Sequence, residues 1–136
     1  MREVFLDGDS RFWCAVDVRA GSATRGSVIG IVGGQALEAD PFKTWPGRVI
    51  ELRRMSVSSS ARGLGVATAL VEVLETHSRA CGIGRVVLST GSVMKPAQRL
   101  YTRCGYVEAR VVQFVMPEFG LTEADDVGYV VYSKEV

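Results

Sequence analysis

The spacing of apolar positions changes at one point near the middle of the chain. Apolar side chains fill five of the nine positions at residues 49–57, which is typical of an interior strand. A cluster of serine and glycine residues at 58–65 then breaks this pattern. From Val66 onward, apolar residues recur mostly three or four positions apart, which is the spacing of one buried helical stripe, and Gly82 suits the end of that helix. The centre of the chain is therefore predicted to be a strand, a short turn and a helix.

Two strand-like runs precede this centre. Residues 12–18 and 28–34 are separated by a polar turn, so they predict a hairpin, and the proline-containing stretch at 36–47 predicts a loop. The paired glycines at 33–34 mark either the end of the second strand, which we favour, or a bulge. Trp45 in the loop is expected to be a packing plug.

The second half of the chain predicts another helix between strands. Residues 85–90 are strand-like, and Pro96 and Gly105 suit the first turn and the end of a helix. Residues 106–115 and 127–132 predict two further strands. The alternation of strands and helices therefore indicates an α/β domain.

Two polar features are interpreted as solvated surface. The loop at 116–126 carries four acidic residues, which indicate a solvated turn, although they could instead attract an amine substrate. His77, the single histidine, falls away from the apolar stripe of its helix. We expect it on a solvated face and assign it no chemistry.

The composition is that of a single globular domain spanning residues 1–136. A chain of 136 residues is long enough to bury one core and too short for two. Its 47% hydrophobic and 23% charged residues are typical of a globular protein. A net charge of +1 creates no broad field for nucleic acid or an anionic membrane, so neither is an expected partner. The cysteines lack metal-ligand spacing, and we expect no metal but free, buried thiols at Cys14, Cys81 and Cys104.

The chain shows no targeting signal. No apolar run approaches the roughly 20 residues needed to span a bilayer, and the N-terminus lacks a basic-then-apolar pattern. We therefore expect a soluble, cytoplasmic domain, with membrane anchoring outside this chain left open. A homodimer is a possible partner arrangement, since it would cover the sheet face that the predicted elements leave open.

The turn before the central helix suits a phosphate. The first N–H groups of a helix lack intrahelical partners, and the helix dipole adds partial positive charge there. Gly63 and Gly65 would let a phosphate approach the backbone, and Arg62 adds a cation. The alternative is that both glycines only make a tight turn. A Walker loop and a dinucleotide fingerprint are both excluded, because Gly65 is followed by neither Lys-Ser/Thr nor the third glycine.

This turn resembles the acetyl-CoA signature of the GNAT superfamily of N-acetyltransferases, Gln/Arg-x-x-Gly-x-Gly/Ala. Arg62, Gly65 and Ala67 match it. Residues 97–106 resemble the family's Ala-x-x-Leu-Tyr-x-x-x-Gly-Phe block, with tyrosine at the last position. Glu51 lies fourteen positions before Gly65, where many members carry a general base.

The resemblance implies a fold and a cosubstrate. The fold would be a mixed, mostly antiparallel sheet, splayed at its centre by the cofactor, with helices on both faces. Acetyl-CoA would be the cosubstrate, held by the backbone of β-strand and turn residues in the middle of the chain. These residues are Met55, Val57, Arg62, Gly63, Leu64, Gly65, Val66, Ala67 and Thr68.

The resemblance also implies catalytic roles for two side chains. Glu51 would be the general base that deprotonates an amine, and Tyr101 the general acid for the leaving thiolate. From the residues alone, the alternative for Glu51 is an exposed strand residue, and the helical stripe favours a core tyrosine at Tyr101, so that only the resemblance gives Tyr101 a catalytic role. The competing hypothesis is a module that binds acetyl-CoA as a sensor or scaffold without catalysis.

Two departures from the family pattern affect these expectations. Only about ten residues precede the first predicted strand, where the family usually has two helices next to the acceptor pocket. These helices are therefore expected to be missing. Met94 stands where most members have asparagine, three positions before Ala97.

Within the superfamily, residues 51–57 are most similar to the camello-like branch, which includes N-acetylaspartate synthetases. Its pattern Glu-Leu-x-Arg-Met-Ser-Val places Arg54 three positions after Glu51. The family's central strand usually contains a bulge, and one extra residue would bring both side chains to the same face. Arg54 would then bind the carboxylate of an amino acid or amino acid conjugate, whereas its alternative is an ion pair with the acidic loop.

Overall fold

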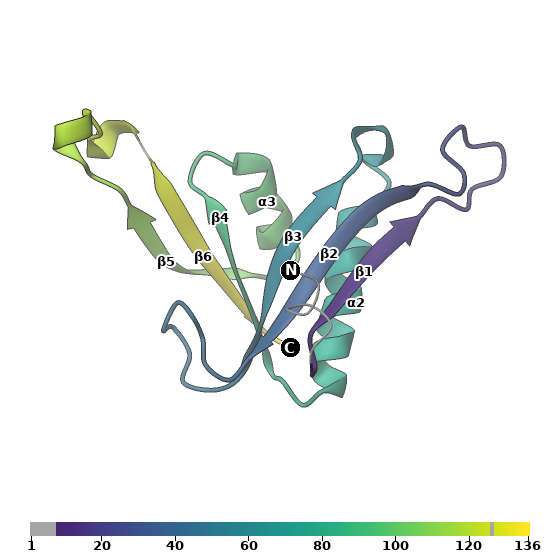
Figure 1. Cartoon of the computed structure of the whole chain (residues 1–136), viewed down its shortest axis with the longest axis horizontal. Helices are drawn as coiled ribbons and strands as arrows, with labels where there is room; N and C mark the ends of the chain where they lie inside the picture. The colour runs from purple at the N-terminus through teal and green to yellow at the C-terminus, as the bar shows by residue number, and fades with distance from the viewer. Residues whose placement is uncertain (1–7, 126) are drawn as a thin grey trace.

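The computed structural model describes residues 8–125 and 127–136. Within this part of the chain, six strands form one sheet, against which two α-helices pack (Figure 1). In chain order the elements are β1 (Arg11–Val16), β2 (Val28–Leu37), β3 (Val49–Val57), α2 (Val66–Ala80), β4 (Arg85–Gly91), α3 (Lys95–Arg103), β5 (Val107–Gln113) and β6 (Gly128–Glu135), with 3₁₀ turns at Ser59–Ala61, Pro117–Phe119 and Glu123–Asp125. The predicted strands and helices are present and the α/β fold is confirmed. The expectation about missing N-terminal helices falls largely on residues outside the described part.

The sheet is mixed and opens in its middle. Its strand order is β1-β2-β3-β4-β6-β5, and all neighbours are antiparallel except β3 and β4. These two parallel strands pair only at Ile50 with Val86 and at Glu51 with Val87. Beyond these pairs they diverge, as the V-shaped arrangement in Figure 1 shows. The predicted opening of a mostly antiparallel sheet is therefore confirmed.

Both helices cover the same face of the sheet. The strand registers place Ile50, Leu88 and Tyr132 on one face. These residues share one buried core with Leu74 of α2 and Tyr101 of α3. The expectation of helices on both faces is therefore wrong for the described residues. The reason is that a loop, and not a helix, covers the second face.

The second face is covered by the loop at residues 38–48. Its Phe42 lies against Tyr129 with ring centroids 6.4 Å apart, and the Arg85 guanidinium stacks on the Trp45 ring at 3.8 Å. Trp45 remains 41% exposed, so it is a cation–π platform for Arg85 and not the packing plug that was predicted. The fully buried residues of this face are Val49, Val87 and Val131.

Glycines in β2 allow α2 to approach the sheet closely. A Cβ atom on Gly30 would lie 2.8 Å from Val66 Cγ1, and one on Gly34 would lie 3.3 Å from Leu74 Cδ1. β2 runs on through Gly33 and Gly34 to its end at Leu37, so the strand end expected at these glycines is wrong. Glycine in this strand therefore reflects close packing of a helix and not a break in the strand.

The ends of both helices follow from local sequence signals. α2 begins after Gly65 and ends at Ala80, and its C-cap Cys81 is followed by Gly82 at φ +72°. Pro96 lies in the first turn of α3, and Gly105 follows that helix at φ +90°. Glycine adopts positive φ without the steric cost of a Cβ atom. The predicted helix ends are therefore confirmed.

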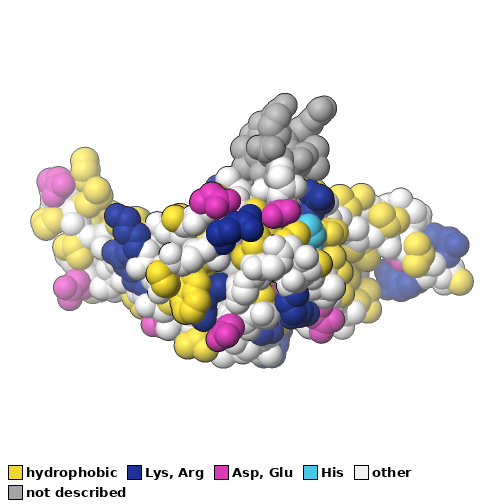
Figure 2. Space-filling model, turned by 90° about the horizontal axis from the view of Figure 1, so that it is seen from below, with side chains coloured by type: hydrophobic (Ala, Val, Ile, Leu, Met, Phe, Trp, Pro, Cys, Tyr) yellow, Lys and Arg dark blue, Asp and Glu magenta, His cyan; other side chains and the backbone are white. Residues whose placement is uncertain are grey.

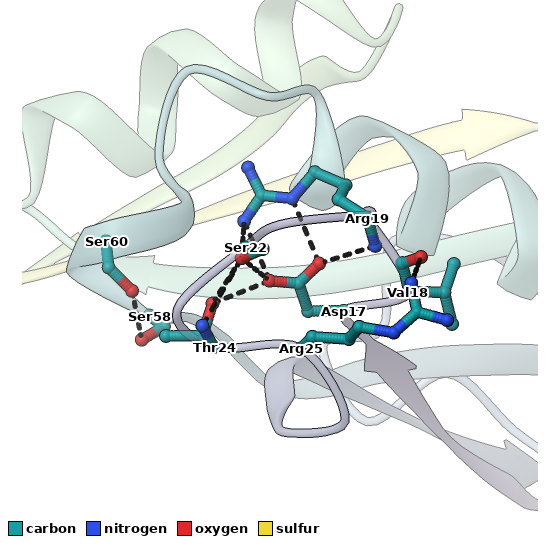
Figure 3. A network of polar contacts seen from close by, with 8 residues as sticks. All are labelled: Asp17, Val18, Arg19, Ser22, Thr24, Arg25, Ser58 and Ser60. Atoms are coloured by element: carbon teal, nitrogen blue, oxygen red, sulfur yellow. Dashed lines mark hydrogen bonds and ion pairs between the residues drawn. The ribbon is translucent and has the colours of Figure 1, made fainter.

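A buried carboxylate organises the turn between β1 and β2. Asp17 is 1% exposed, and it accepts hydrogen bonds from the Arg19 guanidinium and from the hydroxyls of Ser22 and Thr24 (Figure 3). These bonds, with that of Arg19 the strongest, hold the pKa of Asp17 well below its usual range. Side-chain contacts therefore fix this turn, which the strand pattern alone did not reveal.

His77 is half-buried, and the expectation of a solvated face is wrong. Its ring packs edge-on against Trp13 with centroids 5.3 Å apart, and its Nε2 lies 2.6 Å from the carbonyl oxygen of Asp9. Both partners lie outside α2, so the helical pattern could not show them. The thiols are free as expected but are half-buried or exposed instead of buried: Cys81, Cys104 and Cys14.

The described surface shows no dominant charge. Lys and Arg side chains are interspersed with Asp and Glu on the face shown in Figure 2. This mixture agrees with the net charge of +1. None of the helices in the described residues has the length and apolar character needed to cross a bilayer.

Gly30→Ala is expected to lower the free energy of unfolding by about 1–3 kcal/mol, because the new methyl group would press on the stiff, β-branched side chain of Val66. Urea unfolding followed by circular dichroism measures this change. Gly84→Ala is the matched control, since nothing lies within 4 Å of a Cβ atom there. An unchanged midpoint for Gly30→Ala would show that α2 does not require this close approach.

Candidate functional site

A cleft opens where β3 and β4 part. Its volume is about 490 Å³, and it lies between the second half of β3, the end of β4 and the first turns of α3. Its lining combines acidic, basic and hydroxyl side chains with apolar residues and a glycine: Glu51, Leu52, Arg53, Arg54, Met55, Ser89, Thr90, Gly91, Met94, Ala97 and Tyr101. Four residues predicted for the site, Glu51, Arg54, Met55 and Tyr101, are therefore brought together in one cleft.

The start of α2 has features that favour an anion. No side chain caps this helix end, and its first turn contains no acidic residue. Gly63 and Gly65 have φ of +81° and +77°, and a Cβ atom on either would meet nothing within 4 Å. The conformation therefore requires glycine, while the space over the turn is open to a phosphate. The predicted phosphate-binding residues form this turn: Arg62, Gly63, Leu64, Gly65, Val66, Ala67 and Thr68.

The edge of β3 that faces the gap carries backbone groups without a strand partner. Past Glu51, β3 pairs with β2 alone. The Ser58 amide donates to the carbonyl oxygen of Ile29 in β2 at 2.8 Å. Strand alternation then directs the N–H and C=O groups of Val57 and Met55 to the opposite edge, toward the gap. A ligand with extended amide groups can pair with this edge as an added strand would.

Glu51 is half-buried at the point where the strands part. Burial raises the pKa of its carboxyl group, the positive charge of Arg53 opposes this rise, and the negative charge of Asp40 adds to it. A carboxylate with a raised pKa is a stronger base than one on the surface. Glu51 is therefore suited to accept a proton within the cleft.

Tyr101 faces the cleft from α3. Its side chain is 5% exposed and lines the cleft opposite β3. Burial, with a smaller contribution from Cys104, raises the pKa of Tyr101 to about 12. The hydroxyl group is therefore protonated at neutral pH and can donate a hydrogen bond or a proton.

β3 contains a bulge next to the cleft. The register between β2 and β3 shifts, so that Arg54 and Met55 oppose the single residue Val32. Arg54 has φ +56°, which is a strained conformation for a residue with a side chain. Leu52 and Met55 both pack against the core, which leaves Arg54 on the opposite face together with Glu51. The bulge that was expected from the resemblance is therefore present.

Two cleft features were not predicted from the sequence. Arg53 also lines the cleft, and its guanidinium donates to Gln35 Oε1 at 3.1 Å. The sequence signal that could have indicated this role is the position of Arg53 next to Arg54, where a bulge was expected. Gln98 Nε2 donates to the carbonyl oxygens of Gly91 and Ser92 at 3.1 and 2.9 Å, which fixes the turn into α3. No pattern of apolar residues could have indicated this contact.

Comparison with known proteins shows the family to which the chain is similar. Residues 1–106 match the family model described as the acetyltransferase (GNAT) family. The chain is 36% identical over 104 residues to N-acetylaspartate synthetase of Xenopus tropicalis, covering 76% of this chain and 33% of that protein. It is 35% identical over 102 residues to N-acetyltransferase family 8 member 2 of Rattus norvegicus, covering 75% of this chain and 41% of that protein.

A solved structure shows the same fold. Arabidopsis thaliana NAA60 in complex with a bisubstrate analogue superposes with a TM-score of 0.77, at 20% identity, over 98% of this chain and 79% of that chain. At this identity the likeness concerns the fold alone.

The present chain spans about a third of the length of the curated relatives that it matches. The family match itself covers most of the chain and includes the turn of Arg62, Gly65 and Ala67. The chain therefore belongs to the acetyltransferase (GNAT) family.

Proposed function

We propose that this domain transfers an acetyl group from acetyl-CoA to a primary amine. The observation that supports this most strongly is the cleft at the parting of β3 and β4. It is lined by two side chains suited to proton transfer and by Met55 on the unpaired edge of β3, which continues to Val57. The helix end suited to phosphate begins at Val66, which packs against Gly30, the partner of Val57 in β2. Each of these features matches one part of acetyl-CoA or one step of acetyl transfer.

The chain's residues fit the cosubstrate in order along its length. The amides at the start of α2, with Arg62 beside them, would bind the pyrophosphate. The backbone groups of Val57 and Met55 would pair with the two amides of the pantetheine arm. This path leads from the helix end to the cleft that contains Glu51 and Tyr101. When bound, acetyl-CoA supplies the thioester carbonyl carbon that the amine attacks.

The two side chains then divide the proton transfers. An amine arrives as an ammonium ion and must lose a proton before it can attack, so Glu51 would accept that proton. The nitrogen loses a second proton as the amide forms, and the leaving sulfur gains one. The second proton from the nitrogen would replace the one donated to the sulfur, and Glu51 would release the first proton to solvent. Tyr101, protonated at neutral pH, would donate to this sulfur.

Arg54 would select the acceptor. The bulge places its side chain on the face of Glu51, and both residues line the same cleft. A guanidinium group binds a carboxylate through two parallel hydrogen bonds, which would hold an amino acid with its amine near Glu51. The name of the Xenopus relative, N-acetylaspartate synthetase, supports an amino acid as the acceptor. The acceptor class is therefore an amino acid or a small amino acid conjugate.

Acetyl-CoA is expected to bind, and at a hundred times its dissociation constant to stabilise the fold by about 2.7 kcal/mol. Arg62→Ala should weaken binding by about 10- to 100-fold, because one charge-assisted hydrogen bond is lost. Isothermal titration calorimetry measures both. Arg79→Ala, on the exposed far end of α2, is the control and should bind normally. Binding of ATP or NAD without binding of acetyl-CoA would overturn the assignment.

Glu51→Gln is expected to lower turnover by about 10²- to 10⁴-fold with little effect on acetyl-CoA affinity, because the base is removed and its shape is kept. Activity of the wild type should rise with pH through the raised pKa of Glu51, as the carboxyl group ionises, and the variant should lose this acid limb. Release of free thiol from acetyl-CoA with a panel of amines gives the rates. The exposed Glu72→Gln is the control.

Two outcomes of that assay would contradict the proposal. A wild-type protein that binds acetyl-CoA but releases no thiol with any amine would be a binding module. Equal rates for Glu51→Gln and wild type across pH would assign Glu51 to structure.

Arg54→Ala is expected to remove the preference for amino acids over their amides, because the amide lacks the carboxylate that Arg54 would bind. The ratio of kcat/KM for each amino acid and its amide measures this preference. Arg53→Ala should have a smaller effect, since its guanidinium is held by Gln35. A protein that acetylates both forms equally, or a larger effect of Arg53→Ala, would remove Arg54 from the acceptor site.

A further inference from the structure

Glu75 is a buried acidic residue to which the proposed chemistry gives no role. Glu75 lies on the inner side of α2 and is 5% exposed. Its Oε2 accepts a hydrogen bond from the Tyr106 hydroxyl at 2.9 Å, and its Oε1 lies 3.0 Å from Lys134 Nζ. A buried ion pair of this kind is weak evidence for stability, because desolvation offsets much of the attraction. Stability alone therefore does not account for the contacts of Glu75.

The two partners of Glu75, Tyr106 and Lys134, come from two other parts of the fold. Lys134 lies on β6 and also donates to the carbonyl oxygen of Cys104, the C-cap of α3, at 2.8 Å. Its ammonium group lies 5.7 Å from the centre of the Tyr106 ring. Glu75 therefore ties the helix that carries the phosphate-binding turn to the end of α3.

This network reaches the cleft through two aromatic rings. Tyr106 packs edge-on against Tyr101, with ring centroids 5.9 Å apart and planes at 67°. Such a T-shaped contact depends on the orientation of both rings. Tyr106 occupies the position at which the family pattern has phenylalanine, so its hydroxyl adds a contact that phenylalanine could not make.

We propose that Glu75 is a positioning residue, which orients the Tyr106 ring and thereby holds Tyr101 in place for proton donation in the cleft. This inference rests on the proposed role of Tyr101. Burial, followed by the charge of Glu75, raises the pKa of Tyr106 far above its usual range, so its hydroxyl remains a donor to Glu75 at any pH of interest.

A double-mutant cycle separates positioning from simple stabilisation. Tyr106→Phe keeps the ring and removes only the bond to Glu75, and it should lower kcat about five- to tenfold with less than a twofold change in KM for acetyl-CoA. In a Tyr101→Phe background, where no hydroxyl remains to be positioned, the same change should lower kcat less than twofold. Glu75→Leu, which removes the acceptor of the Tyr106 hydroxyl, should show the same pattern as Tyr106→Phe: about a five- to tenfold loss of kcat with Tyr101 present and less than a twofold loss in the Tyr101→Phe background.

Ser78→Ala is the matched control. Ser78 lies one turn further along α2, and its buried hydroxyl donates to the carbonyl oxygen of Ile83 at 2.7 Å, away from α3. This variant should lose stability and keep kcat within about twofold, because it removes one buried hydrogen bond outside the network. Equal losses of kcat from Tyr106→Phe in both backgrounds would overturn the proposal.

A readout without turnover distinguishes failure of this inference from failure of acetyl transfer. With tyrosine labelled at ring carbons, the Tyr101 signal is identified by its loss in Tyr101→Phe. Because Tyr106→Phe keeps its ring, any shift of the Tyr101 signal reports a change in ring orientation. Tyr106→Phe and Glu75→Leu should both shift this signal, and Ser78→Ala should not. An unmoved Tyr101 signal would contradict the positioning role even if the protein transfers no acetyl group.

Discussion

The parting of β3 and β4 is the constraint on which the rest of the structure depends. Only two residue pairs join these parallel strands, Ile50 with Val86 and Glu51 with Val87. Past them, one edge of β3 has backbone donors and acceptors without a strand partner, and such groups must bond to water or a ligand. A sheet that stayed closed here would satisfy these groups internally. It would also leave no space between Glu51 and Tyr101.

The open edge is useful only if the start of α2 reaches it, and this placement depends on glycine in two different ways. Gly63 and Gly65 are required by the positive φ of the turn, and the space above them is open. Gly30, by contrast, is favoured because a Cβ atom there would lie only 2.8 Å from Cγ1 of Val66 in the first turn of α2. Gly63 and Gly65 determine the backbone conformation of the predicted anion-binding turn, and Gly30 allows the start of α2 to lie close to the sheet.

Signals within a few residues were sufficient to predict the elements and the glycine turn before α2. The turn up to Gly65 and the helix start at Pro96 are local features, so the sequence contains their full cause. The errors arose where the cause lies elsewhere in the chain. β2 continues through Gly34 because a helix packs there, and His77 is half-buried because Trp13 and the segment before β1 cover it. Glu75 falls on the buried stripe of α2, but its partners Tyr106 and Lys134 are known only from the fold.

Burial acts on the two proposed proton-transfer groups in the same direction but with different consequences. It raises the pKa of Glu51, which makes the carboxylate a better base, while the positive charge of Arg53 opposes this rise. It raises the pKa of Tyr101 to about 12, which keeps the hydroxyl protonated. The cleft must therefore be dry enough to shift both groups and open enough to admit an amine. Under this division of roles the base limits activity on the acid side, and any decline well below pH 12 on the alkaline side must come from a group other than Tyr101.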